Sequence, residues 1–346
     1  MKSLEINPKT SIIILNYNGG KLIETCIKSV FNNSMNFELI LIDNNSSDNS
    51  QIICKKKFPK IILYENEQNI GLTARNIGID KAKGEFIVFL DSDTIVEQNW
   101  LENLLDSFKK NGEGLYQPKI LEMNQDQVIS SAGNMINIFG LPFSTGRGKK
   151  DNGQYDKFRK IGYTSGACTF TSIKIIKKIG VIDPIFFAYH DDLDYGWRGS
   201  LLNISSYYEP KSIIYHHVSH TLSWNSKKFF LLERNRWICL LTLYSTKTLI
   251  KLFPLLCILE IGIFGYFISK RMSGVKIKAF FDLIRLNNKI KKRKRSLQKL
   301  RKIDDHEIIE NFVDDFFLTT SRELKQHSKI SKIITLLSKF SKKLIT

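Results

Sequence analysis

The chain has 346 residues, 42% of them hydrophobic, and carries a formal net charge of +18 at pH 7. This length accommodates one large domain, or one domain with an appendage, and the hydrophobic content is sufficient for a folded core. The five cysteines are odd in number and widely spaced, which argues against a disulfide framework or a zinc site. We expect them to be small buried hydrophobic residues in a reducing compartment.

The positive charge is concentrated in the C-terminal part of the sequence. Residues 245–346 contain 23 Lys and Arg against 9 Asp and Glu, whereas residues 1–244 contain 29 against 25. We therefore expect a globular body, 1–244, and a basic region, 245–346. Such an asymmetry indicates an anionic surface as partner. The first eight residues lack the apolar segment of a signal peptide, so we expect a cytoplasmic protein.

Strand and helix patterns alternate through the first 110 residues. Apolar runs and helical spacing predict, in chain order, a strand at 11–16, a helix at 21–31, a strand at 38–43, a helix from about 49, a strand at 61–64, a helix at 72–83 and a strand at 86–90. This alternation predicts an α/β fold, with a mostly parallel sheet flanked by helices on both faces.

Two carboxylates follow the last of these strands, in the segment Phe89-Leu-Asp-Ser-Asp-Thr94. Ligands of open α/β sheets bind just beyond the carboxyl ends of such strands. Asp91 and Asp93 repel each other there unless a cation or hydrogen bonds compensate, and Mg²⁺ and Mn²⁺ prefer oxygen ligands. The alternative is an aspartate that caps the next helix.

The pattern weakens between 112 and 160, where several glycines predict loops, and such a stretch beside a cleft is a candidate mobile lid or acceptor loop. Regular patterns return at 166–180, in a helix from about 192 and in a strand at 212–215.

The basic region contains three distinctive segments. Residues 252–268 are apolar but short for a membrane span and contain Glu260, which favours an interfacial, re-entrant or packing helix. Residues 289–295 are mostly basic, without the interleaved aromatics of a nucleic-acid patch. Residues 328–345 form a basic amphipathic pattern. Together they predict a helical extension that binds an anionic membrane surface, packing on protein being the alternative.

Seven segments in order resemble the inverting family 2 glycosyltransferases, which have the GT-A fold, and most closely the rhamnosyltransferase- and galactofuranosyltransferase-like branch. The segments are 12–19, 43–48, 69–78, 89–94, 190–194, 215–219 and 234–236. One position departs from the family pattern, because the usual Glu-Asp pair is Asp191-Asp192 here.

The resemblance implies transfer of a sugar from a nucleoside diphosphate to a hydroxyl, with a divalent metal, Mg²⁺ or Mn²⁺. It assigns Asp93 to the metal and Asp91 to the nucleotide sugar near the ribose. His216 would complete the metal shell, or else be a satisfied histidine at a strand end, with His217 and His220 as bystanders. Arg75 would lie near the nucleotide.

The same resemblance implies a nucleotide pocket and a general base. Asp43 would accept a hydrogen bond from the imide of uracil or thymine, which favours a UDP- or dTDP-sugar, and Asn16 and Tyr17 would line the pocket. The base is expected in the pair Asp191-Asp192, because a partly buried carboxylate beside another one has a raised pKa. Alignment with the family favours Asp192.

Arg234, Arg236 and Trp237 match a family block that could grip the diphosphate of the donor or of a lipid-linked acceptor. Together with Glu233 they match the Gln-x-x-Arg-Trp signature of processive synthases except that Glu replaces Gln. A processive polysaccharide synthase is therefore an alternative function.

The sequence thus predicts a glycosyltransferase of surface polysaccharide assembly, held at the inner face of the cell membrane. Its acceptor would be a saccharide on a polyprenyl diphosphate. A nucleotidyltransferase and a basic nucleic-acid-binding protein are weaker alternatives, and we expect no nucleic acid partner. The sugar, the linkage and the oligomeric state are left open.

Overall fold

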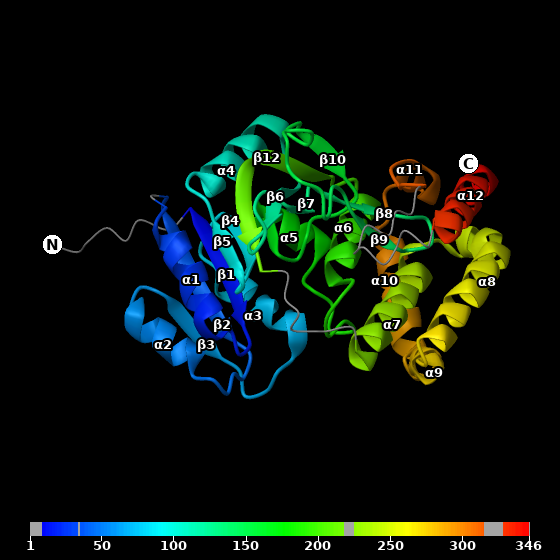
Figure 1. Cartoon of the computed structure of the whole chain (residues 1–346), viewed down its shortest axis with the longest axis horizontal. Coiled ribbons are helices and arrows are strands. Elements are labelled where there is room, and N and C mark those ends of the chain that lie inside the picture. Colours follow the sequence, from blue (N-terminus) through cyan, green and yellow to red (C-terminus); the bar gives the residue numbers. More distant parts are fainter. Residues whose placement is uncertain (1–8, 34, 218–224, 315–327, 346) are drawn as a thin grey trace.

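The computed structural model describes residues 9–33, 35–217, 225–314 and 328–345, the side chains of 328–331 excepted. A mixed sheet with its flanking helices occupies one end of the molecule (Figure 1). The C-terminal helices gather at the opposite end, away from the first strands. His220 and the segment 218–219, named above, lie outside the described residues.

The main sheet has the strand order β10-β12-β6-β11-β4-β1-β2-β3, with β5 beside β12 and β7 beside β6. The strands β1, β2, β3 and β4 are mutually parallel, whereas β11 runs antiparallel to both β4 and β6. The strands are β1 Thr10–Asn16, β2 Phe37–Asp43, β3 Ile62–Glu65, β4 Phe86–Asp91, β5 Thr94–Val96, β6 Leu115–Glu122, β7 Ile129–Ser131, β10 Arg159–Ile161, β11 Cys168–Ser172 and β12 Ser206–His216. A separate hairpin pairs β8, Asn134–Ile136, with β9, Pro142–Ser144.

Helices cover both faces of this sheet, as the alternating pattern predicts. They are α1 Gly20–Phe31, α2 Ser50–Lys57, α3 Arg75–Lys81 after a 3₁₀ turn at Gly71–Ala74, α4 Trp100–Asn111, α5 Ile173–Ile179 and α6 Asp191–Leu201. In β1, Ile12 and Ile14 pack in one hydrophobic cluster with Ile23 of α1, while Ile13 packs on the other face with Ile79 of α3. A strand buried on both faces needs a continuous apolar run, which explains the pattern in the sequence.

The expectation of a loop between 112 and 160 is wrong for its first part. Residues 115–122 form β6, a strand inside the sheet between β12 and β11. Its sequence is not a plain apolar run, because the buried Lys119 pairs with Asp151 at 2.6 Å and with Asp156 at 2.5 Å. Gln117 is also buried and donates to Ser131. Tertiary ion pairs and hydrogen bonds stabilise these polar side chains, and the local sequence carries no sign of them.

The C-terminal region is helical, as expected. Its helices are α8 Thr246–Ser269, α9 Ser273–Arg285, α10 Asn287–Leu300, α11 Asp305–Glu310 and α12 Ser328–Ile345, and α7 Ser226–Leu243 precedes them within the expected body 1–244. Helix α7 packs against α9 and α10, and one hydrophobic cluster runs from Ile136 through Leu240 to Ile334. The division at 244/245 stays a prediction, and this cluster joins the two sides of it.

The five cysteines are free thiols, and Cys26, Cys54, Cys168 and Cys239 are buried as expected. Burial raises the pKa of the Cys26 thiol to about 12, so this thiol is inert at neutral pH. Cys257 differs from the expectation, because it is exposed on α8. An exposed cysteine within an apolar helical run shows that one side of α8 is not covered by the protein.

Candidate active site

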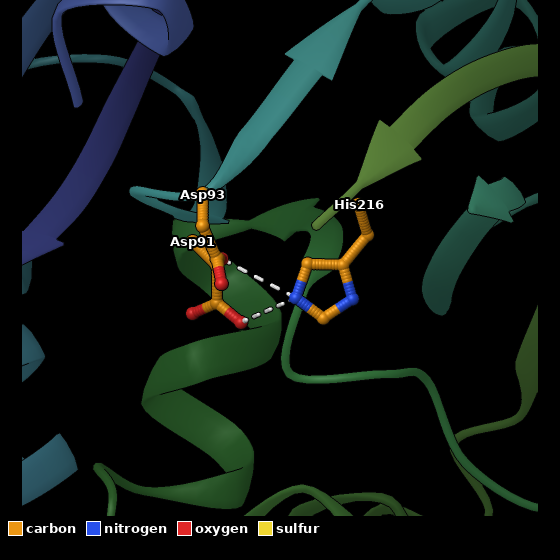
Figure 2. A group of neighbouring side chains, drawn as sticks. All are labelled: Asp91, Asp93 and His216. Carbon is orange, nitrogen blue, oxygen red and sulfur yellow. Dashed lines mark ion pairs between the residues drawn. The ribbon is translucent and has the colours of Figure 1, made fainter. Parts of the chain in front are cut away.

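Asp91, Asp93 and His216 come together where β4, β5 and β12 meet (Figure 2). Asp91 is the last residue of β4, and His216 ends β12 directly opposite Thr94 of β5. The Nε2 atom of His216 lies 3.2 Å from Oδ1 of Asp93 and 4.0 Å from Oδ2 of Asp91. The structure therefore brings together three of the residues that the sequence singled out.

Local hydrogen bonds set the direction of the two carboxylates. The Thr94 hydroxyl donates to the carbonyl of Asp91 at 2.8 Å, and the His217 amide donates to the carbonyl of Asp93 at 2.8 Å. These bonds fold the chain back between β4 and β5, so that both carboxylates face the imidazole of His216.

The donor set of this cluster fits a hard divalent cation. One ligand atom from each of Asp91, Asp93 and His216 can be chosen so that all lie within 4.8 Å of one another. Burial lowers the pKa of His216, but the hydrogen bond to Asp93 and the charges of Asp93 and Asp91 outweigh it and raise the pKa overall. The two carboxylates thus favour a positive charge at this position, and Mg²⁺ or Mn²⁺ could supply it.

Arg75 lies beside this cluster as a buried guanidinium. Its Nη2 donates to Oδ1 of Asp91 at 2.5 Å and to the carbonyl of Gly166 at 3.1 Å. Burial raises the pKa of Asp91, and the charge of Asp93 adds to this effect, although Arg75 opposes it. Arg75 therefore holds Asp91 in place and compensates part of its charge.

The pair Asp191 and Asp192 begins helix α6 close to the same strand ends. Asp192 accepts hydrogen bonds from the amides of Leu193 at 2.8 Å and Gly166 at 3.2 Å. Gly166 thus contacts both Asp192, through its amide, and Arg75, through its carbonyl. Burial, aided by the charge of Asp192, raises the pKa of Asp191 to about 8.

Asp194 belongs to a different environment from the first two acids. It is buried and forms ion pairs with Arg198 at 2.9 Å and with Arg293 of α10 at 2.5 Å. These bonds tie α10 to α6, which carries the acid pair, so Asp194 orients this helix within the fold.

Asp43 and Asn16 end the paired strands β2 and β1 and face each other. The Nδ2 atom of Asn16 donates to Oδ1 of Asp43 at 2.8 Å, and Ser46 donates to both carboxylate oxygens of Asp43. The Oδ1 atom of Asn16 is buried without a hydrogen-bond partner among the described residues. The neighbouring Tyr17 is half exposed, at 53%. This leaves an acceptor atom and an aromatic ring for a ligand.

Arg234, Arg236 and Trp237 lie on α7, where the two arginines already have ion partners. Arg234 pairs with Asp282 of α9 at 3.2 Å. Arg236 is buried, pairs with Glu233 at 3.0 Å and contacts Glu260 of α8. Trp237 is partly buried in the hydrophobic cluster of the C-terminal helices. These contacts connect α7, α8 and α9, and a role in diphosphate binding stays a prediction.

Two residues near the site were not anticipated. Gly166 contacts Arg75 and Asp192 through its backbone carbonyl and amide. Any residue type has these groups, so the sequence could not indicate this role. Arg147, in the loop that follows β9, lies close enough for its charge to oppose protonation of His216. Burial raises the pKa of Tyr163, and the charge of Arg147 opposes part of this rise. Arg147 lies between two glycines and belongs to no recognisable sequence motif, so the sequence did not indicate a role for it.

The mixed sheet, the paired aspartates at its strand ends and the helical extension define a GT-A-like fold. Residues 11–180 match the family model described as "Glycosyl transferase family 2". This segment of the chain is therefore a family 2 glycosyltransferase domain.

Curated relatives are similar to about a third of this chain, and the matched part spans only a minor share of the two relatives named here. The minor teichoic acid biosynthesis protein GgaB of Bacillus subtilis is 37% identical over 118 residues, which cover 32% of this chain and 13% of GgaB. The poly(ribitol-phosphate) β-N-acetylglucosaminyltransferase TarP of Staphylococcus aureus is 33% identical over 114 residues, covering 31% of this chain and 35% of TarP.

Two solved structures share the fold. GalNAc-T7 with UDP, GalNAc and Mn²⁺ has a TM-score of 0.56 at 18% identity, covering 69% of this chain and 48% of that one. The structure of residues 1–349 of S. aureus TarS in complex with UDP-GlcNAc has a TM-score of 0.54 at 16% identity. This match covers 95% of this chain and 89% of that one. The likeness to TarS thus includes the C-terminal helices.

Proposed function

We propose that the protein is an inverting glycosyltransferase of cell-surface polysaccharide assembly, which moves a sugar from a UDP- or dTDP-sugar to a hydroxyl of a saccharide acceptor. The observation that carries this proposal is the link through Gly166. One residue's backbone joins the Asp91–Asp93–His216 cluster, through Arg75, to the acid pair at the start of α6. A cation-binding group beside a carboxylate base is what the reaction needs.

The leaving group is a nucleoside diphosphate, whose charge must be stabilised as the sugar departs. Asp93, His216 and Asp91 would hold a divalent cation, which when bound supplies positive charge to the diphosphate. The Mn²⁺ and UDP named with GalNAc-T7 and the UDP-GlcNAc named with TarS support this class of donor.

Asp43 and Asn16 would bind the base at the ends of β2 and β1. A carboxylate accepts a hydrogen bond from the imide N–H of uracil or thymine. The donors from Asn16 and Ser46 fix the orientation of Asp43, and the half-exposed ring of Tyr17 offers a stacking surface.

The acid pair would remove the proton of the acceptor hydroxyl. Asp191, with its pKa of about 8, is largely protonated at neutral pH and therefore relieves the repulsion on its neighbour. Burial raises the pKa of Asp192, as suits a base, and the two backbone N–H bonds that it accepts oppose part of this rise. We therefore assign Asp192 as the base, with Asp191 as the group that tunes it.

The donor sugar and the acceptor are the finer parts of the proposal. The sequence branch points to a rhamnosyl or galactofuranosyl donor, whereas the name of GgaB connects that protein with teichoic acid and the name of TarP connects that protein with poly(ribitol-phosphate). We propose an acceptor on a polyprenyl diphosphate at the cytoplasmic face of the membrane. Arg147, Arg234 and Arg236 are the candidate ligands for its charge.

A donor-hydrolysis screen with Mn²⁺ or Mg²⁺ and a panel of UDP- and dTDP-sugars tests this function. We expect one donor to release its nucleoside diphosphate slowly and only with metal. Asp93→Ala should abolish the release, while Asp80→Ala, at an exposed aspartate of α3, should keep it. Equal release by Asp93→Ala and the wild type would contradict the proposed site. With an acceptor, products longer by one sugar would distinguish single transfer from processive synthesis.

A further inference from the structure

Exposed large hydrophobic side chains are concentrated in the C-terminal helices. Fifteen of the twenty on the described surface lie after residue 244. Those on α8, α9 and α12 are Ile250, Phe253, Ile258, Ile261, Tyr266, Ile268, Ile277, Phe280, Phe281, Ile284, Ile333, Leu336, Phe340 and Leu344. Scattered apolar side chains are normal on a protein surface, but a concentration on adjacent helices marks an interaction site.

Helix α8 presents two opposite apolar faces. Leu252, Leu256 and Leu259 are buried against the protein. Ile250, Ile261 and Ile268, at helical spacing on the other side, are 69%, 74% and 56% exposed. This outward stripe runs from Ile250 to Ile268 along α8, which at 1.5 Å per residue is about 27 Å.

Helices α9 and α12 continue the apolar surface. Helix α8 packs against both of them, and the three lie together at one end of the molecule (Figure 1). On α9 the stripe has the spacing i, i+3, i+4, i+7, from Ile277 to Ile284, and on α12 it includes Leu336 and Phe340.

Positive charges border these stripes. Lys332, Lys339 and Lys343 are exposed on α12, beside its apolar stripe. Exposed Lys270 and Arg271 follow α8. Helix α10, which packs against α7 and α9, carries the further basic residues Lys291, Lys292, Arg295 and Lys299, which line one hollow. Apolar stripes bordered by cations are complementary to a bilayer with anionic headgroups.

The arrangement of Glu260 bears on how α8 would meet a membrane. By length and composition alone, α8 is the one helix of the described chain that could span a bilayer. Its Glu260, however, points inward, where it contacts Arg236 of α7 and Lys276 of α9. Glu233 joins the same network, and burial is outweighed by Arg236 and Lys276, which lower its pKa to about 2. This buried ion cluster attaches α8 lengthwise to the protein.

We propose that the faces of α8, α9 and α12 form one docking surface for an anionic lipid bilayer, with α8 lying along the membrane plane rather than crossing it. This surface goes beyond the sugar-transfer site and does not depend on it. The inward face and Glu260 remain on the protein, and the outward isoleucines and phenylalanines enter the headgroup region.

Vesicle co-sedimentation of the full chain tests this surface. We expect binding to phosphatidylcholine vesicles that contain phosphatidylglycerol, and weak binding to phosphatidylcholine alone. Ile261→Asp and Phe281→Asp should each weaken binding about tenfold or more. Ile52→Asp is the matched control, because Ile52 is exposed on α2, far from the C-terminal helices. All variants change exposed side chains, and equal melting temperatures would show that the fold is kept.

Several results would overturn the proposal. One is a wild type that binds neither vesicle, and another is an equal loss of binding in Ile52→Asp. A third is a dimer that Ile261→Asp dissociates without any vesicle binding by the wild type, which would make a second copy the occupant. Retention through an alkaline carbonate wash would contradict the in-plane arrangement, whereas release supports it.

Cys257 gives an independent readout of the same face. It is the exposed cysteine, while the other four are buried, so an environment-sensitive fluorophore on its thiol reports on α8. We expect a blue shift and higher intensity with anionic vesicles, and quenching by a lipid that carries a shallow nitroxide. An unchanged spectrum with sedimented protein would show that another surface binds.

Discussion

Arg75 donates a hydrogen bond from Nη2 to Oδ1 of Asp91 at 2.5 Å, although the guanidinium is almost completely buried. A buried cation beside a strand-end carboxylate fixes the orientation of that carboxylate and compensates its charge. Arg75 thus supports the cluster of Asp91, Asp93 and His216 from within the fold, and its guanidinium also reaches the carbonyl of Gly166.

Replacing Arg75 should damage the site more than a change at an exposed arginine. We expect Arg75→Met to reduce metal-dependent donor turnover about 10- to 100-fold, the range for groups that orient metal ligands. Arg75→Lys keeps the charge but loses the two-partner geometry, and should fall between Arg75→Met and the wild type. Turnover measured across a Mn²⁺ titration checks this, and unchanged activity of Arg75→Met would contradict the assigned role.

The metal cluster predicts ligand-dependent stability. Mn²⁺ at one hundred times its Kd should stabilise the wild type by about 2.7 kcal/mol, because it binds the folded state. His216→Ala should lose most of this effect, while His306→Ala, at an exposed histidine of α11, should keep it. Thermal unfolding with and without Mn²⁺ measures the difference. An equal response of both variants would exclude His216 from the metal shell.

Asp191 predicts a pH dependence of stability. Its pKa is about 8 in the folded protein and near the ordinary 3.8 when unfolded. Between these values the folded state binds more protons, so this group makes the free energy of unfolding fall as the pH rises from about 4 to 8. Asp191→Asn mimics the neutral acid and should lack this fall. The melting temperature of the variant should therefore rise relative to that of the wild type between pH 5 and pH 8. A difference between the two melting temperatures that does not change with pH would contradict the raised pKa of Asp191.

The base assignment predicts a selective loss of catalysis. Asp192→Asn should lower kcat about 10²- to 10⁴-fold, the usual contribution of a general base, with little change in donor affinity. Asp106→Asn, at an exposed aspartate of α4, is the control. Steady-state kinetics with a saccharide acceptor separates kcat from KM. A variant with raised KM and unchanged kcat would assign Asp192 to binding instead.

Arg147 predicts a contribution from the loop after β9. Its charge acts on His216, and no ion pair within the described chain neutralises it. We expect Arg147→Ala to raise the KM for the nucleotide sugar or the acceptor, because one fixed positive charge near the diphosphate is lost. Lys149→Ala, two residues further along the loop and exposed, should behave like the wild type. Equal KM values for both variants would remove Arg147 from the site.

The sequence was most informative where function and local pattern coincide. The apolar runs of β1, β2 and β4 are buried on both faces, and their ends carry Asn16, Asp43 and Asp91 as the pattern predicts. Spacing along the chain cannot, however, reveal that β12 brings His216 within 3.2 Å of Asp93. The family resemblance supplied that expectation, and the β5–β12 pairing explains it.

The parts that the sequence missed depend on contacts between distant residues. Strand β6 contains Lys119, which pairs with residues more than thirty positions away, so no local rule identifies it as a buried strand. Diphosphate binding by the arginines of α7 stays a prediction, but the ion pair of Arg236 with Glu233 could not be foreseen from the sequence. The sequence alone does not distinguish an arginine that pairs with a carboxylate of the protein from one that binds a ligand.

The central claim is that a nucleoside diphosphate binds at Asp43 and at the metal cluster. Calorimetric titration of UDP into the protein, with and without Mn²⁺, tests it most directly, with Asp93→Ala and Asp80→Ala in parallel. We predict binding by the wild type and Asp80→Ala that Mn²⁺ strengthens, and loss of the Mn²⁺ effect in Asp93→Ala. Absence of nucleotide binding under all conditions, with dTDP as well as UDP, would contradict the account.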